Sequence, residues 1–355
     1  MKIRFSVLAP SLSALVIAAG CGPTPVATIS PTPSPPAVFD DSYGFLVGNT
    51  VRKESDPKPL FTLNTGDAGL VVSPDGRHVA YEVKNELRVM DIAPNAVPRT
   101  VATTSGKEGG LTPAWSTDST GLVVATSGPS SGVNEVPATY VAIRVVDLAG
   151  GAAREVARIP NAGVVPLAWD RQTHLITAYE TSEMGTSAYD VIDDRGKLKR
   201  TFVDPGLFVV ESSKDAHHVL GRGDPNTTIR VWPGDSYAGG VALVSTAGDE
   251  HLATAAWRPG TSEVGVLFHG DRLELWDANG ARRTIPLPAA PETSDRYASL
   301  SFRLDGKAAV VSRMSGDEFN PKTYAVAVDL ASGRTAVVDW AGSYPQGPAL
   351  SVRIG

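Results

Sequence analysis

Two stretches of the sequence carry the residue types that hydrolases and metal sites use. The first, residues 128–132, reads Gly-Pro-Ser-Ser-Gly and fits the Gly-x-Ser-x-Gly pattern around a nucleophilic serine. Such a serine sits on a sharp turn between a strand and a helix, whereas this segment continues into residues 133–137 (VNEVP), which are typical of a loop. We therefore expect no catalytic role for this motif.

Histidines and aspartates are the second group with possible chemistry. His217 and His218 follow Asp215, but neighbouring residues of a strand point to opposite faces and cannot chelate one ion together. The spacing of the 6 histidines and the single cysteine matches no zinc site. Aspartates that end several predicted strands are explained as turn formers, with a structural calcium role as the alternative. The sequence thus predicts no metal and no cofactor.

Other polar residues could bind a ligand without reacting with it. They lie in or beside the connections that lead into the first strand of successive repeats, described below. Loops on a rigid scaffold are where binding sites are commonly found, and solvated loop residues without a ligand are the alternative. The candidate ligand-binding residues are Lys107, Glu108, Asp249, His251, Arg296, Tyr297 and Tyr344.

A repeat with spacings of 43 to 54 residues runs along most of the chain. Its clearest copy, residues 71–81 (VVSPDGRHVAY), contains a short apolar strand, a Pro-Asp-Gly turn and a second strand. Later strands such as 87–91 (LRVMD) and 273–277 (LELWD) bring most repeats to four strands. Strands of period two with turns between them predict antiparallel sheets, and four strands per repeat of this length predict one propeller blade.

Three tryptophans occupy one equivalent position of this repeat. Trp115, Trp169 and Trp257 each end a predicted first strand, where Val72 and Phe302 stand in other copies. Because apolar residues of several kinds share the position, we expect these rings to pack between blades. An aromatic platform for sugars is the alternative.

The two ends of the repeat region fit each other. Residues 350–354 (LSVRI) repeat residues 300–304 (LSFRL) and supply a first strand with nothing after it. Three strands without a first strand precede the first full repeat, at residues 44–47, 50–53 and 59–62. Their pairing would remove two exposed sheet edges. The predicted fold is therefore all-β, a seven-bladed β-propeller whose last blade combines the C-terminal strand with three N-terminal strands.

The first 41 residues have a different character. Lys2 and Arg4 precede an apolar run that ends at Cys21, which fits a secretory signal and is shorter than the ~20 residues of a membrane-spanning helix. Residues 17–21 (IAAGC) resemble a bacterial lipobox, in which the cysteine is lipidated, and a general signal with a stray cysteine is the alternative. We expect a signal peptide over 1–20, lipidated Cys21 and a Pro-rich linker over 21–41, and the propeller over 42–355.

The turn of residues 73–76 (SPDG) and the strand after it resemble the β-propeller repeats of TolB-like proteins. Trp276-Asp277 also resembles the dipeptide of WD repeats, although the Gly-His signature of that family is missing. The resemblance covers nearly all of residues 42–355, without the separate N-terminal domain that TolB carries. It implies a propeller fold and no single activity, because such propellers include scaffolds, binding modules and noncatalytic domains of peptidases.

Composition and charge narrow the function further. The chain is 42% hydrophobic and 20% charged, as in globular proteins, and its net charge of −6 disfavours a nucleic-acid partner. We expect a monomeric, lipid-anchored, extracytoplasmic propeller of the bacterial envelope that binds a protein or small molecule without catalysis. The alternative is a small propeller hydrolase or lyase with a polar site at the channel mouth.

Overall fold

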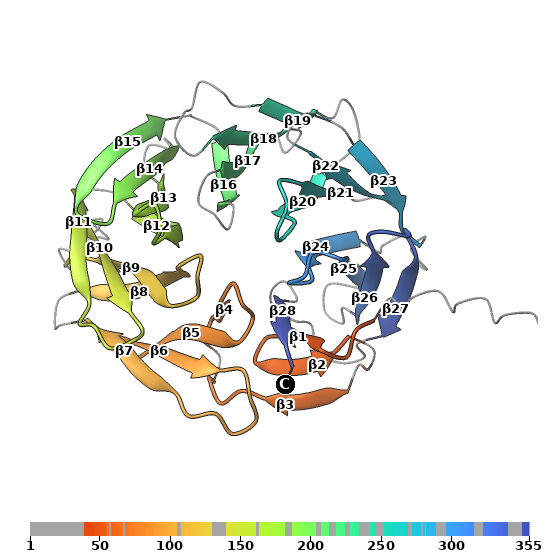
Figure 1. Ribbon diagram of the computed structural model, residues 1–355, viewed down its shortest axis with the longest axis horizontal. Coiled ribbons are helices and arrows are strands. Elements are labelled where there is room, and N and C mark those ends of the chain that lie inside the picture. Colours follow the sequence, from red (N-terminus) through yellow and green to blue (C-terminus); the bar gives the residue numbers. More distant parts are fainter. Residues whose placement is uncertain are drawn as a thin grey trace, which may run out of the picture. The chain divides into compact units, whose positions relative to one another are not determined.

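The chain divides into two units, Met1–Pro36 and Ala37–Gly355, and the described residues all belong to the second. In the computed structural model these residues form β-strands connected by turns (Figure 1). No helix among them is long and apolar enough to cross a membrane. The structure describes residues 39–354 except 55, 57, 67, 105–107, 130–139, 161–162, 182–186, 204–206, 213–217, 224–227, 234–240, 246–251, 269–271, 278–279, 281, 289–295, 316–321 and 340–349.

The strands follow the predicted repeat closely. The prediction of an all-β fold made of four-stranded antiparallel repeats is confirmed. The strands are β1 (Tyr43–Val47), β2 (Thr50–Lys53), β3 (Pro59–Thr62), β4 (Val71–Val72), β5 (His78–Val83), β6 (Glu86–Asp91), β7 (Arg99–Thr103), β8 (Gly109–Trp115), β9 (Gly121–Ser127), β10 (Tyr140–Asp147), β11 (Arg154–Pro160), β12 (Gly163–Asp170), β13 (Leu175–Thr181), β14 (Ser187–Asp193), β15 (Lys197–Val203), β16 (Leu207–Ser212), β17 (His218–Gly223), β18 (Thr228–Pro233), β19 (Val241–Ser245), β20 (Leu252–Trp257), β21 (Val264–Phe268), β22 (Arg272–Trp276), β23 (Arg282–Pro286), β24 (Arg296–Phe302), β25 (Ala308–Ser315), β26 (Lys322–Asp329), β27 (Thr335–Asp339) and β28 (Leu350–Arg353).

The described strands pair into seven four-stranded sheets. Six of them use consecutive strands, from β4–β7 to β24–β27, and we number these the first to the sixth sheet. The remaining one, here called the shared sheet, has the order β28-β1-β2-β3. Within this unit, Figure 1 shows the first strand of each numbered sheet nearest the middle and the fourth strand outermost.

The turn between the first and second strand of a sheet is held by a recurring serine and aspartate. In the first sheet the Ser73 hydroxyl donates to Asp75 Oδ1 (2.5 Å), and the His78 backbone N–H donates to Ser73 Oγ (3.0 Å). The second sheet repeats both contacts with Ser116 and Asp118, at 2.6 Å within the pair and 2.8 Å from a backbone N–H. The side chains thus satisfy the backbone donors that a tight turn leaves free.

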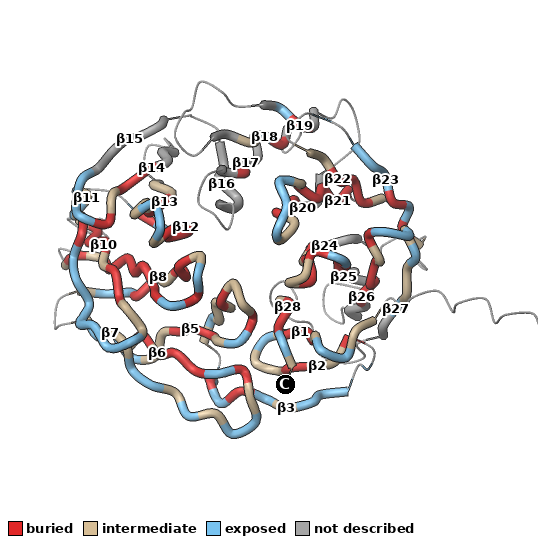
Figure 2. The backbone as a smooth tube through the Cα atoms, viewed as in Figure 1, coloured by how far each residue is buried: buried red, intermediate tan, exposed pale blue. Residues whose placement is uncertain are grey.

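The tryptophans at the ends of the first strands are packed as predicted. Trp115 and Trp169 are each buried, and the Trp169 ring lies so close to Gly121 of the preceding sheet that an added Cβ would approach its Cζ3 to 2.6 Å. Gly265 and the Phe302 ring repeat this contact between the fifth and sixth sheets. Where burial is described, Figure 2 shows buried residues in the middle strands of the sheets. Glycine on one sheet therefore makes room for the large ring of the next.

The shared sheet joins segments from the two ends of the described chain. β1 and β28 pair antiparallel, with Gly44 opposite Val352 and Leu46 opposite Leu350. Val352 and Leu46 belong to one core cluster with Val79 of the first sheet. Phe45, on the other face of β1, packs with Val310 of the sixth sheet. The shared sheet therefore contributes to two separate cores.

A buried ion pair also connects the shared sheet to the sixth sheet. Arg303 Nη1 lies 3.3 Å from Glu54 Oε2, and the two side chains are only 7% and 2% exposed. Arg303 also holds Asp305 through two contacts of 2.9 and 3.1 Å, and the Asp40 backbone N–H donates to Glu54 Oε2. Burial raises the pKa of Glu54, while the contacts with Asp40 and Arg303 oppose that effect.

We expect the Val352→Asp substitution to destabilise the entire unit by about 3 kcal/mol or more, because it places a charge in the core that β28 closes. The matched control is Val337→Asp, at a valine that is 56% exposed on β27. Thermal unfolding followed by circular dichroism measures both variants. Equal melting temperatures for the two variants would show that β28 contributes little to stability.

Candidate functional site

Most of the predicted ligand-binding residues lie outside the described residues. They are Lys107, Asp249, His251 and Tyr344. The predicted lipidation site Cys21 and Ser130 of the serine motif also lie outside the described residues. Arg296 and Tyr297 begin β24, and only the backbone of these two residues is described. Glu108 is the one predicted residue whose side chain the structure describes.

Glu108 is engaged in contacts within its own sheet. Its Oε1 accepts a hydrogen bond from Arg144 Nη2 at 2.7 Å and one from the Tyr140 hydroxyl at 3.4 Å. Arg144 also approaches Glu155 at 3.7 Å, and the Arg158 guanidinium lies 4.0 Å from the centre of the Tyr140 ring. The hydrogen bond from Arg144 lowers the pKa of Glu108. This carboxylate therefore ties the entry of β8 to β10 and has little capacity left for a ligand.

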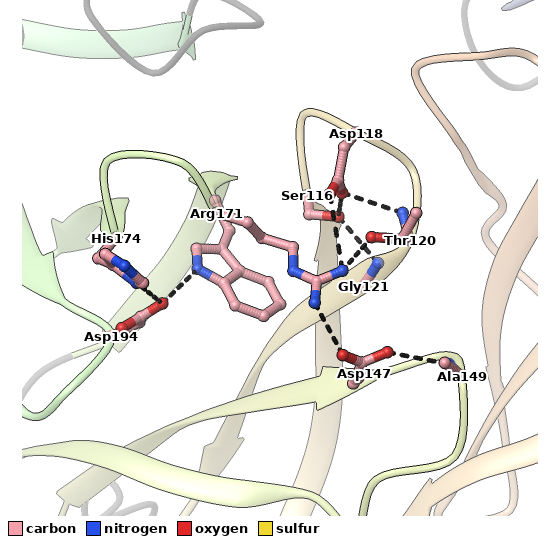
Figure 3. Close-up of polar contacts among 10 residues, drawn as sticks. Ser116, Asp118, Thr120, Gly121, Asp147, Ala149, Arg171, His174 and Asp194 are labelled. Carbon is pink, nitrogen blue, oxygen red and sulfur yellow. Dashed lines mark hydrogen bonds and ion pairs between the residues drawn. The ribbon is translucent and has the colours of Figure 1, made fainter.

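A pocket lies between the second and third sheets, at the end of β10 that is opposite to the Glu108 contacts. It has a volume of about 360 Å³ and is formed by turns that follow β10, β12 and β14. Figure 3 shows the polar contacts around it. The lining residues are Val145, Asp147, Ala152, Arg154, Trp169, Arg171, His174 and Asp194.

Arg171 joins the two sheets across this pocket. Its Nη2 lies 2.7 Å from Asp147 Oδ2, its Nη1 lies 3.6 Å from Asp118 Oδ2, and it also donates to the Thr120 hydroxyl (Figure 3). The guanidinium carbon lies 5.3 Å from the centre of the Trp169 ring, within the range of a cation–π interaction. The positive charge of Arg171 is thus matched by carboxylates and an aromatic face of the protein itself.

His174 and Asp194 form a second pair at the pocket. His174 Nδ1 lies 3.1 Å from Asp194 Oδ2, and the same oxygen accepts a hydrogen bond from Trp169 Nε1 at 3.2 Å. Because a carboxylate accepts, the contact assigns the proton to Nδ1 and leaves Nε2 as an acceptor. Asp194 is 8% exposed, whereas His174 is 43% exposed and has a left-handed φ of 61°. The pair therefore presents one imidazole nitrogen to solvent from a fixed turn.

The first sheet contains a related pair. His78 Nδ1 lies 2.8 Å from Asp91 Oδ1, and these residues begin the second strand and end the third strand of their sheet. His174 and Asp194 lie beside the corresponding strand ends of the third sheet. The His78 ring stacks on Trp115 at 6.1 Å between centres. A His–Asp contact is thus a feature of the turn that occurs in at least two sheets.

Arg154 differs from the other charged residues of the pocket. It begins β11 opposite Val145, whose side chain packs in one cluster with Trp169, so Arg154 shares the face that meets the third sheet. Arg154 is exposed, and no hydrogen bond, ion pair or ring contact joins its guanidinium to another described residue. The described residues also contain no group of three His, Cys, Asp or Glu side chains that could hold a metal ion.

The sequence motifs do not indicate this pocket. His174 is one of the histidines whose spacing matches no zinc site, Asp147 is one of the aspartates that end predicted strands, and Arg154, Arg171 and Asp194 belong to no motif. Aligning the third copy of the repeat with the first on Trp169 and Val72 places His174 next to the position of His78, whereas Asp194 falls beyond the position of Asp91. The repeat therefore indicates the histidine, but not the aspartate or the arginines around it.

Comparison with known proteins supports the fold. No protein-family model matches the chain, and no curated protein matches its sequence. Among solved structures, a functionally unknown protein from Desulfotomaculum acetoxidans DSM 771 is 12% identical over 88% of this chain and 99% of that chain, with a TM-score of 0.55. An oligogalacturonate lyase in complex with manganese is 13% identical over 75% of this chain and 74% of that chain, with a TM-score of 0.54.

A prolyl endopeptidase is 15% identical over 86% of this chain and 49% of its own, with a TM-score of 0.56, so this chain spans about half of that enzyme. Identities this low show the fold alone. The similarities support a general propeller-type fold, in agreement with the four-stranded sheets.

We expect Glu108→Gln to lower the free energy of unfolding by about 1–2 kcal/mol at pH 7, because a charge-assisted hydrogen bond to Arg144 is weakened. A carboxylate whose pKa is lowered by folding stabilises the protein above its ordinary pKa of 4.5 and loses this effect as the pH falls through its folded pKa. The difference from the native protein should therefore shrink in urea unfolding curves below pH 4.5.

The matched control is Glu86→Gln, since Glu86 pairs with Arg88 at 37% side-chain exposure, and this variant should lose less stability than Glu108→Gln. An identical loss for Glu108→Gln at pH 3 and pH 7 would contradict an ionic role for Glu108.

Proposed function

We propose that this protein is a lipid-anchored, extracytoplasmic β-propeller of the bacterial envelope that binds a ligand without catalysis. The proposal includes a seven-bladed propeller in which the shared sheet is the last blade. Its support is the pairing of β28 with β1 and the packing of that sheet against both the first and the sixth sheets. The lipid anchor rests on residues 17–21 (IAAGC), and the Pro-rich stretch after Cys21 supplies the spacer.

The observation that carries a binding function is the pocket between the second and third sheets. Its volume of about 360 Å³ suits a small molecule, and its lining combines apolar surface with charged groups, of which Asp147, Arg171 and Asp194 are fixed by neighbouring contacts. Side chains that are already held in place lose little conformational entropy when a ligand binds. A rigid pocket of this kind supports binding by shape and hydrogen bonds.

The second candidate function is a small propeller hydrolase or lyase, and the contact between His174 and Asp194 favours it. An imidazole oriented by a carboxylate is a common general base. The related contact between His78 and Asp91 argues for the simpler reading, since there the His ring is stacked on Trp115. We therefore assign the pair to the turn structure and favour binding. The remaining parts of the proposal are a monomeric chain and no nucleic-acid partner, given the net charge of −6.

The anchor predicts that Cys21→Ala moves the protein from the membrane fraction to the soluble fraction, because the thiol that carries the lipid is gone. Fractionation of cells and immunoblotting measure the distribution. Ser13→Ala changes the signal segment but keeps the cysteine, and it should leave the protein in membranes. Membrane attachment of the Cys21→Ala protein at the native level would rule out the lipid anchor.

The pocket predicts that Ala152→Trp abolishes small-molecule binding while the protein stays folded, because the indole fills the cavity from an exposed position. Ligand-observed NMR of residues 37–355 against a library of small polar compounds measures binding. Ala149→Trp is the control, as Ala149 is exposed in the same turn but does not line the pocket. Compounds that bind both variants as well as the native protein would place the binding site elsewhere.

A further inference from the structure

We propose that the pocket between the second and third sheets recognises a small carboxylate, whose anionic group pairs with Arg154 while its apolar part contacts the wall formed around Val145 and Ala152. This inference rests on the binding function proposed above and specifies its ligand class. It follows from which charges of the pocket are already paired and which one is not.

The carboxylates of the pocket have internal partners. Asp147 uses Oδ2 for Arg171 (2.7 Å) and Oδ1 for the Ala149 backbone N–H (2.9 Å). Asp194 Oδ2 accepts from both Trp169 Nε1 and His174 Nδ1. A ligand cation would have to compete with these contacts. The two acidic residues therefore stabilise the pocket walls through the oxygens that accept these hydrogen bonds.

Arg171 is likewise occupied. Its guanidinium contacts Asp147, Asp118 and the Thr120 hydroxyl, and it covers the Trp169 ring. Arg154 is the lining cation without a partner among the described residues. A guanidinium presents five N–H donors in a planar fork that matches the two oxygens of a carboxylate. Arg154 is exposed, and its guanidinium therefore keeps a fork of donors open for bidentate binding.

Arg154 lines the pocket from the first position of β11. Its register partner Val145 packs in the core cluster that includes Trp169, and both Val145 and Arg154 line the cavity. Ala152 lies in the turn that leads into β11, two residues before Arg154, and adds exposed apolar surface. A ligand that places an oxyanion on Arg154 therefore has an apolar wall beside it.

A carboxylate fits better than a phosphate group. Phosphate sites usually combine several cations or a cluster of backbone N–H groups. Here one unpaired arginine is available. The carboxylates of Asp147 and Asp194 also line the pocket, and they repel a dianion more than a monoanion.

The test uses matched acids and amides of one shape: phenylacetate, 3-phenylpropionate and 4-phenylbutyrate, each compared with its neutral amide by ligand-observed NMR titration of residues 37–355. Compounds of this size should bind with Kd values of about 1 mM. We expect at least one acid to bind about tenfold more tightly than its amide. In the Arg154→Gln protein this difference should disappear, whereas it should persist in Arg77→Gln, which removes an exposed arginine of the first sheet.

Three outcomes would overturn the inference: acids and amides bind the native protein equally, neither binds, or Arg154→Gln keeps the preference for the acid. Tighter binding of phenyl phosphate than of every acid would also overturn the carboxylate assignment. The binding function itself is judged separately by Ala152→Trp, since compounds lost in that variant but insensitive to Arg154→Gln would keep the pocket and reject only the ligand class. A thermal unfolding curve of each variant confirms that it is folded.

Discussion

The pairing of β28 with β1 is the constraint on which the arrangement of the other sheets depends. Bringing distant segments together costs chain entropy that grows only slowly with their separation, by about 0.6 kcal/mol per doubling of loop length. Burial of Val352 and Leu46 in a core shared with the first sheet offsets this cost. The contact between Glu54 and Arg303, 249 positions apart, adds a polar link to the sixth sheet. A sheet that is bound on both faces fixes the spacing of its neighbours.

Within this framework the serine–aspartate turn recurs in the first and second sheets, but the side chains between adjacent sheets differ from one junction to the next. The Asp75 backbone N–H donates to Ser119 Oγ between the first and second sheets, where His78 stacks on Trp115. Between the fifth and sixth sheets, Arg258 Nε donates directly to the Gly306 carbonyl oxygen at 2.6 Å. The second and third sheets instead meet through Arg171 and its carboxylates, which leave a cavity beside them. The candidate pocket thus lies where one junction departs from the other two.

The sequence was sufficient for the repeat because strands and turns are local. Residues 71–81 carry both the alternating apolar pattern and the turn chemistry, and the structure has β4, β5 and the Ser73–Asp75 contact there. The candidate site was not predictable in the same way. The contact of Asp147 with Arg171 joins two sheets, the contact of His174 with Asp194 joins residues 20 positions apart, and no spacing rule relates either pair. Glu108 was selected for its place before a strand, but its partner Arg144 lies 36 positions later and gives it a structural role.

The charge distribution also sets the range over which the pocket could act. The chain has a net charge of −6, so at a distance it repels anions, and salt screens exposed charges beyond about 8 Å. Near the pocket, Arg171 is shared by the carboxylates of Asp147 and Asp118, and Arg154 is the lining arginine without a described ion pair. A ligand that displaces water from this guanidinium lowers the local dielectric constant and strengthens the attraction. Recognition of an anion here would therefore be short-ranged, and contacts formed after encounter would govern affinity through the dissociation rate rather than through electrostatic steering.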